Sequence, residues 1–87
     1  MGRYGLHAVE FGPAGERGFW KCSRPVQDRI REALRKLCNS PRSGKALHGE
    51  LEGFYRLRVG GYRIIYKVLN AEQKIIVRAV GPRGDIY

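Results

Sequence analysis

The segment "FYRLRVGGYRIIY", residues 54–66, carries the clearest structural signal in the sequence. Two runs in which apolar residues alternate with arginines flank Gly60-Gly61, and glycine tolerates the positive φ that tight hairpin turns require. The segment therefore predicts a β-hairpin with a two-residue turn. Counted outward from that turn, its pairs are Val59 with Tyr62, Arg58 with Arg63, Leu57 with Ile64, Arg56 with Ile65 and Tyr55 with Tyr66.

This register divides the side chains of the hairpin between two faces, because successive residues of a strand point to opposite sides. One face is apolar and suited to pack against helices; it contains Tyr55, Leu57, Val59, Tyr62, Ile64 and Tyr66. The other face gathers Arg56, Arg58 and Arg63. Two arginines directly opposite each other cost up to about 1 kcal/mol, and no local carboxylate neutralises them. Stability alone does not favour such a face.

Two helices are predicted before the hairpin. The clearer one lies in "SRPVQDRIREALRKLCN", residues 23–39, with Ser23 as N-cap or Pro25 as a first-turn residue. Its apolar stripe consists of Val26, Ile30, Ala33, Leu34 and Leu37. A shorter helix is expected over residues 14–22, although Gly15 and Gly18 each cost about 1 kcal/mol relative to alanine in a helix.

The remaining predicted elements are strands. Alternation predicts a first strand over residues 3–11, and "KIIVRAV", residues 74–80, predicts a strand in the interior of the sheet, since its apolar run is nearly continuous. The end of that strand is expected to return either to the open end of the hairpin or to its arginine face. The fold class is therefore α+β, a single domain over residues 1–87 in the order β-α-α-β-β-β. The two N-terminal helices are expected on one face of a small, mostly antiparallel sheet.

Charge restricts the partners of this domain. The 87 residues include 17 Lys and Arg against 8 Asp and Glu, a net charge of +9, which favours a polyanionic partner. No apolar run approaches the ~18 residues of a membrane span, and the N-terminus does not resemble a signal peptide, so a cytoplasmic location is expected. His7 and His48 do not stand at metal-ligand spacing from other ligands. We expect neither a metal site nor a cofactor.

The order of elements, "YRLRVGGYRIIY" at residues 55–66 and "VGPRGDIY" at residues 80–87 resemble RelE-type toxins of bacterial and archaeal toxin–antitoxin pairs, within the RelE/ParE superfamily. The resemblance covers nearly the whole chain and is weakest at the glycine-rich first helix. It implies a metal-independent mRNA endoribonuclease (mRNA interferase) that cleaves in the ribosomal A site. It also implies a RelB-like antitoxin whose C-terminal segment wraps the toxin.

The resemblance assigns roles to individual residues. Arg56 and Arg58 stand where the family has two catalytic basic residues, often lysines, and Arg63 matches the arginine that holds the scissile phosphate. Arg83 matches an arginine after the last strand, and Tyr87 a C-terminal tyrosine that stacks on a base or transfers a proton. Arginine in place of lysine is a departure from the family pattern, and the extra C-terminal helix of some relatives is missing.

Several further residues have alternative interpretations. A guanidinium with a pKa above ~12 is a poor base, so another group of the protein, or the ribosome, would have to accept the proton. The candidates in the chain are Tyr87, which we favour, and His48, which falls where some relatives have a basic residue. For His48 a purely structural role is the simpler explanation. Phe54 falls on the arginine face, where it could stack on an RNA base or pack at the sheet edge. Phe19 and Trp20 are expected to anchor the first helix, although a patch left exposed there could receive the antitoxin.

Two alternative functions remain open from the sequence. A ParE-like toxin would inhibit DNA gyrase without cleaving RNA, and such relatives generally lack the full set of arginines and tyrosine. A non-catalytic RNA-binding module would use the same basic face to hold phosphates and would leave the RNA intact.

Overall fold

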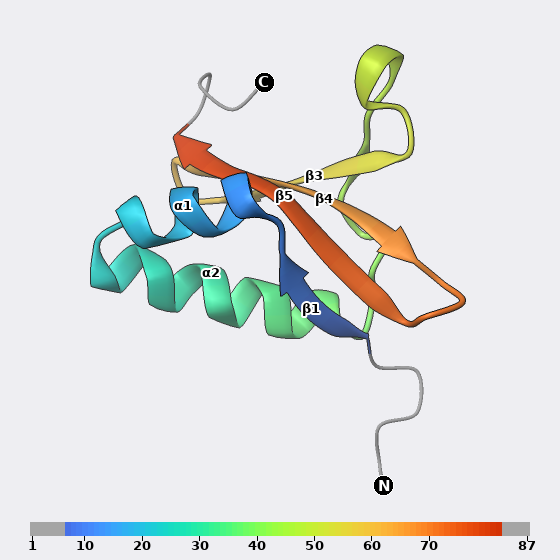
Figure 1. Cartoon of the computed structure of the whole chain (residues 1–87). Coiled ribbons are helices and arrows are strands. Elements are labelled where there is room, and N and C mark those ends of the chain that lie inside the picture. The colour runs from blue at the N-terminus through green and yellow to red at the C-terminus, as the bar shows by residue number, and fades with distance from the viewer. Residues whose placement is uncertain (1–6, 83–87) are drawn as a thin grey trace, which may run out of the picture.

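The computed structural model describes residues 7–82 of the 87-residue chain. Two helices precede most of a five-stranded sheet, which confirms the predicted α+β class (Figure 1). The elements in chain order are β1 (Ala8–Phe11), α1 (Pro13–Lys21), α2 (Arg24–Leu37), β2 (Lys45–Ala46), the short 3₁₀ helix η1 (Gly49–Leu51), β3 (Phe54–Val59), β4 (Tyr62–Leu69) and β5 (Lys74–Pro82).

The strands are arranged in the order β1-β5-β4-β3-β2, and only the β1–β5 pair is parallel. Strand β5 therefore lies inside the sheet, as its apolar run predicts. The β3–β4 hairpin has the predicted register, including Arg58 opposite Arg63 and Tyr55 opposite Tyr66. Gly60 turns the chain with a φ of +61°, a conformation that glycine adopts without the steric cost other residues incur.

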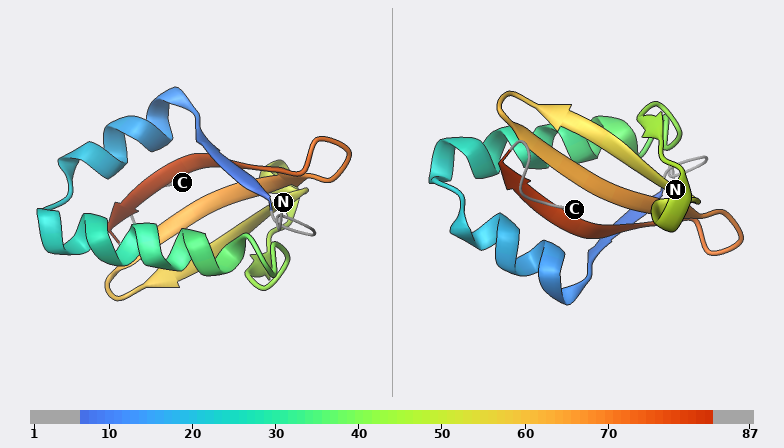
Figure 2. Two further views of the ribbon diagram at one scale, coloured as in Figure 1. Left: turned by 90° about the horizontal axis from the view of Figure 1, so that it is seen from below. Right: turned by 90° about the horizontal axis from the view of Figure 1, so that it is seen from above.

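The hydrophobic core lies between the helices and one face of the sheet. Viewed from below, α2 crosses in front of the strands, and viewed from above the strands lie in front of it (Figure 2). The predicted stripe of α2 supplies Ile30, Leu34 and Leu37, which are at most 4% exposed, and β4 supplies Ile64 and Tyr66. The apolar face of the hairpin is thus the face that packs against the helices, as predicted.

Helix α1 approaches strand β5 unusually closely because of its two glycines. A Cβ added at Gly15 would stand 2.4 Å from the carbonyl oxygen of Val77, and one at Gly18 would stand 2.0 Å from that of Val80. No side chain fits at such distances. The glycines lower the helix propensity of α1 but allow its backbone to lie directly on the strand, so tertiary packing outweighs propensity here.

Strand β2 was not predicted. It lies in the polar loop before the hairpin and pairs Lys45 with Arg56 at the sheet edge. The phenolic oxygen of Tyr66 anchors the start of this segment by accepting a hydrogen bond of 3.0 Å from the backbone N–H of Gly44. Burial raises the pKa of Tyr66 above its ordinary value near 10, although the Gly44 bond acts in the opposite direction. Long-range contacts of this kind leave no local sequence signal.

The end of β5 decides between the two alternatives left by the sequence. Gly81 pairs with Arg63 and Pro82 with Tyr62, so the strand ends beside the hairpin turn and the Arg58–Arg63 pair. The alternative that it returns to the open end of the hairpin is wrong. The antiparallel register explains this, since β5 starts at the open end, with Lys74 opposite Leu69.

Candidate nucleic-acid interface

The sheet face turned away from the helices carries a dense group of cations. We call it the open face; its members are Lys45, Phe54, Arg56, Arg58, Arg63, Ile65, Lys67 and Arg78. They come from β2, β3, β4 and β5, so the sheet pairing holds them together. Of these side chains, only Ile65 is fully buried, at 1% exposed. Because Ile65 is apolar, it lowers the local dielectric constant, and this strengthens the electrostatic interactions of the cations around it.

Arg58 and Arg63 face each other across the hairpin next to its turn. Arg58 is exposed and Arg63 is half-buried. Directly opposed like charges are destabilising in a strand pair, and guanidinium groups are well suited to grip phosphate oxygens in pairs. The pairing of Arg58 with Arg63 thus follows the register predicted from the sequence.

Four carboxylates of the described part of the chain form ion pairs with cations outside the open face. Asp28 pairs with Arg24 and Arg31, Glu32 with Arg35, and both Glu10 and Glu72 with Lys74, at 2.6–3.7 Å between N and O. Among residues 7–82, no carboxylate lies within ion-pair distance of Lys45, Arg56, Arg58, Lys67 or Arg78. Within the described residues, these five cations of the open face therefore carry positive charge that no ion pair offsets.

The remaining predicted site residues have different outcomes. Phe54 lies on the open face at the opposite end of β3 from Arg58. His48 is exposed and directly precedes η1; its neighbour Leu47 donates a backbone hydrogen bond to Phe54. His48 therefore lies at the Phe54 end of the hairpin and not beside the Arg58–Arg63 pair. Arg83 and Tyr87 lie outside the described residues.

Sequence reasoning missed three cations of this face. Lys67 could have been found by extending the hairpin register by one pair, because it lies opposite Phe54. Lys45 depends on the unpredicted strand β2. Arg78 depends on an irregularity in β5, since Ile65 pairs with Ala79 while the next residue, Tyr66, pairs with Val77. Such a β-bulge places one extra residue in a strand. The sequence "KIIVRAV" contains no pattern that predicts it.

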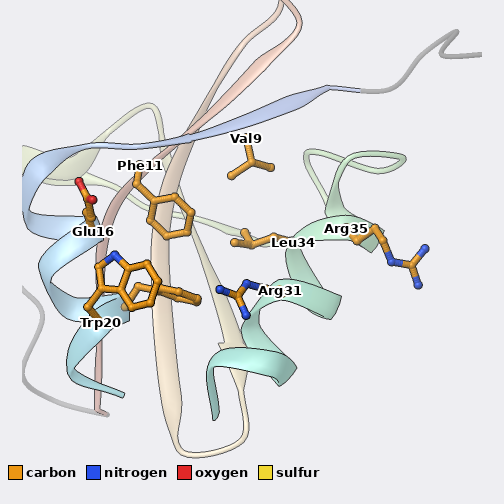
Figure 3. Close-up of a pocket in the computed structure, with 8 residues that line it drawn as sticks. Val9, Phe11, Glu16, Trp20, Arg31, Leu34 and Arg35 are labelled. Carbon is orange, nitrogen blue, oxygen red and sulfur yellow. The ribbon is translucent and has the colours of Figure 1, made fainter. Parts of the chain in front are cut away.

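A second surface feature lies on the other side of the molecule. A groove of about 580 Å³ between β1, α1 and α2 is lined by Val9, Phe11, Glu16, Phe19, Trp20, Arg31, Leu34 and Arg35. Trp20 is 60% exposed, although its ring contacts that of Phe19 edge-on at 5.2 Å between centroids. Figure 3 shows Trp20 and the guanidinium of Arg31 facing each other across the groove, while Arg35 points away. An exposed tryptophan beside an apolar groove is typical of a protein-binding surface.

Within residues 7–82, no group of three or more His, Cys, Asp or Glu side chains is placed to hold a metal ion. No helix in the same range is long and apolar enough to cross a membrane.

Comparison with known proteins places the chain among toxins. Residues 13–87 match the family described as "ParE toxin of type II toxin-antitoxin system, parDE". An Escherichia coli protein described as "Putative RelE-like toxin protein" is 28% identical over 85 residues, 93% of this chain and 90% of that protein. Toxin RelG of Mycobacterium tuberculosis is 37% identical over 46 residues, which cover 53% of each protein.

Solved structures show the same fold. A chain of the toxin–antitoxin complex RelBE2 from Mycobacterium tuberculosis superposes with a TM-score of 0.81 at 28% identity, covering 90% of this chain and 99% of that one. A chain of the intact Escherichia coli RelBE complex gives 0.75 at 26% identity, covering 87% and 95%. Isolated Escherichia coli RelE gives 0.76 at 21% identity, covering 87% and 83%, and supports the fold alone.

Proposed function

Because the chain belongs to the ParE toxin family of type II toxin–antitoxin systems, within the RelE/ParE superfamily, we propose that it acts as a ribosome-dependent mRNA endoribonuclease. It cleaves mRNA in the ribosomal A site, in the cytoplasm, and a cognate antitoxin silences it. The family establishes a toxin of a toxin–antitoxin pair; the reaction, the ribosome and the mRNA are our proposal.

The observation that carries the proposal is the gathering of Arg56, Arg58 and Arg63 on the open face. Among residues 7–82, neither Arg56 nor Arg58 has a carboxylate within ion-pair distance. Their mutual repulsion lowers the stability of the sheet, and a bound phosphodiester would remove that cost. A surface selected only for stability would place carboxylates beside Arg56 and Arg58, as the chain does for Lys74.

The chemistry suits RNA, which carries its own nucleophile. The 2′-oxygen attacks the adjacent phosphorus, the bond from phosphorus to the 5′-oxygen breaks, and the products are a 2′,3′-cyclic phosphate and a 5′-hydroxyl. We assign Arg63 to the scissile phosphate, with Arg56, Arg58 and Arg83 stabilising the charge that develops on its oxygens. Tyr87 accepts the proton of the 2′-hydroxyl, because arginine is a poor base. Tyr87 accepts this proton as the phenolate and returns it to water, and water donates a proton to the leaving 5′-oxygen, so the protons balance.

The groove around Trp20 is our candidate for the antitoxin. Several similar structures are complexes described as RelB–RelE or RelBE, in which a toxin is bound to its antitoxin. The groove offers apolar walls, and the exposed Trp20 beside them suits an apolar segment of a partner. We propose that a segment of a RelB-like antitoxin occupies it and continues towards the open face.

The decisive experiment adds the purified protein to translating ribosomes and maps the 5′ ends of the mRNA. Wild type is expected to produce cuts in the A-site codon, and Arg63→Ala or Arg83→Ala to abolish them while circular dichroism and thermal unfolding show a folded protein. Folded wild type that leaves mRNA intact on translating ribosomes, yet binds RNA, would replace this function by the non-catalytic RNA-binding module.

Inhibition of DNA gyrase is the second candidate, because the matching family is that of the ParE toxin. The arginines of the open face favour the ribonuclease. A gyrase supercoiling assay separates the two: the ribonuclease proposal expects normal supercoiling at concentrations of protein that cleave mRNA.

A further inference from the structure

The open face contains a second cationic group at the far end of the hairpin from the Arg58–Arg63 pair. Phe54 pairs with Lys67 across β3 and β4. The Nζ of Lys67 lies 5.7 Å from the centroid of the Phe54 ring, and the Cζ of Arg78 lies 5.6 Å from it. Phe54 and Lys67 are half-buried and Arg78 is exposed. One aromatic ring thus contacts two cations that come from different strands.

Arg78 reaches this position from the bulge in β5. The register passes from the Ile65–Ala79 pair to the Tyr66–Val77 pair, so Arg78 is the extra residue with no partner on β4. Bulges are over-represented next to active sites, where they redirect a side chain. Val77 and Val80 on either side of the bulge both remain in the core. The irregularity therefore preserves the packing while an exposed cation projects over Phe54.

No ion pair offsets the charge on this group in the part of the chain that the structure describes. Neither Lys67 nor Arg78 has a carboxylate within ion-pair distance among residues 7–82. Lys74, on the same strand as Arg78, lies 3.1 Å from Glu10 and 3.7 Å from Glu72. The interaction of each cation with the ring offsets only part of their mutual repulsion. The pair of cations thus remains available for an anionic ligand.

The group is continuous with the proposed cleavage site. Phe54 is four residues from Arg58 along β3, which corresponds to about 13 Å at ~3.3 Å per residue. Arg56 and the buried Ile65 occupy the intervening row. A single-stranded nucleic acid running along the hairpin would therefore meet cations over the whole length, with an aromatic ring at one end. Single-strand binding sites combine these two elements, a basic track for phosphates and a ring for stacking.

We propose that Phe54, Lys67 and Arg78 form a second nucleotide subsite, which binds the RNA strand flanking the cleaved phosphodiester. A phosphate lies between Lys67 and Arg78, and a base takes the place of one of the two cations over the Phe54 ring and stacks on it. This proposal rests on RNA being the ligand of the open face. An acidic protein segment would be attracted by the cations, but it carries no base that would stack on the Phe54 ring.

The test measures the affinity of the full chain for 2′-O-methyl oligoribonucleotides, which cannot be cleaved because their 2′-oxygen is blocked. Fluorescence anisotropy gives the Kd for oligomers of about four and about ten nucleotides, lengths within the range of single-strand sites. The variants are Phe54→Leu, Lys67→Gln and Arg78→Gln. Lys36→Gln and Arg42→Gln remove the same charge from exposed positions of α2 and of the loop that follows it, and serve as controls.

We expect Phe54→Leu to weaken binding of the longer oligomer at least fivefold, as a lost stacking contact does. Lys67→Gln and Arg78→Gln should each reduce the slope of log Kd against log salt by about 0.7, the value for one phosphate contact on a single strand. The controls should change neither quantity as much. The subsite would be overturned if the subsite variants and the control variants changed the Kd and the salt slope equally. It would also be overturned if the subsite variants lost binding of the antitoxin but not of RNA.

The outcomes also separate this proposal from the proposed function. Wild type that fails to cut mRNA on ribosomes, while the subsite variants still weaken RNA binding, would remove the nuclease and leave the subsite standing. Wild type that cuts mRNA, with subsite variants that bind and cut like wild type, would remove the subsite alone.

Discussion

Arg58 and Arg63 illustrate how one pair of residues can serve function at the expense of stability. They lie directly opposite each other in the hairpin, and Arg58 has no carboxylate partner in the described part of the chain. Replacement of one arginine should therefore relieve the repulsion. The same replacement should also weaken the binding of a phosphate.

We predict that Arg58→Thr raises the free energy of unfolding by about 0.5 kcal/mol, because the repulsion disappears and threonine favours strands. The same variant should lose RNA cleavage. Urea denaturation and the ribosome assay measure the two effects. Arg42→Gln, at an exposed loop position, is the control and should change neither. A variant that is both less stable and fully active would contradict our interpretation of the pair.

Tyr66 is a buried residue whose hydroxyl has a defined partner. Its ring is stacked on that of Tyr55 at 5.5 Å between centroids, and its oxygen accepts the hydrogen bond from Gly44. Tyr66→Phe leaves the Gly44 N–H without this partner, and we expect a loss of about 1–3 kcal/mol in unfolding free energy. Tyr55→Phe keeps the stacked pair and should cost less.

The pH dependence of Tyr66 has a definite sign. Because burial raises its pKa in the folded state, the neutral phenol contributes stability that is fully present below pH 10 and is lost as pH rises through the folded pKa. The difference in unfolding free energy between wild type and Tyr66→Phe should therefore shrink above pH 10. A difference that grows with pH in denaturation experiments would show the opposite shift.

At the scale of elements, the contact between α1 and β5 depends on glycine. The glycines of α1 reduce its helix propensity, yet the closest one would place a Cβ only 2.0 Å from the backbone oxygen of Val80. Gly18→Ala gains about 1 kcal/mol in propensity, but it must push the helix away from the strand.

We predict that Gly18→Ala lowers the free energy of unfolding by about 1–2 kcal/mol, since overpacking outweighs propensity. Thermal unfolding measures the effect, and about 4–8 °C is expected for each kcal/mol in a domain of this size. Arg17 is exposed on the same helix, so Arg17→Ala compared with Arg17→Gly isolates propensity, with alanine the more stable. Stabilisation by Gly18→Ala would disprove the close contact.

At the scale of the whole molecule, the two proposed activities occupy opposite sides. The open face lies on the outer side of the sheet, and the groove around Trp20 lies among β1, α1 and α2. Separate surfaces allow variants that lose one function and keep the other.

We predict that Trp20→Ala weakens binding of the co-expressed cognate antitoxin by about 30-fold, the effect of a 2 kcal/mol hot spot. Cleavage of mRNA by the antitoxin-free protein should be unchanged. Isothermal titration and the ribosome assay measure the two quantities. Lys21→Ala, the next residue of α1 and outside this groove, is the control. If Trp20→Ala lost cleavage of mRNA but still bound the antitoxin, the assignment of the two surfaces would have to be reversed.

The sequence by itself determined the hairpin register, the division of its side chains between core and open face, and the stripe of α2. These features follow from local periodicity and a glycine turn, which act over a few residues. Tertiary structure alone decided the bulge at Arg78, the strand at Lys45, the place of His48 and the contact of Gly18 with β5. Each of these depends on two segments that meet only after folding, because the geometry of their backbones, and not local preference, determines which side chains come together.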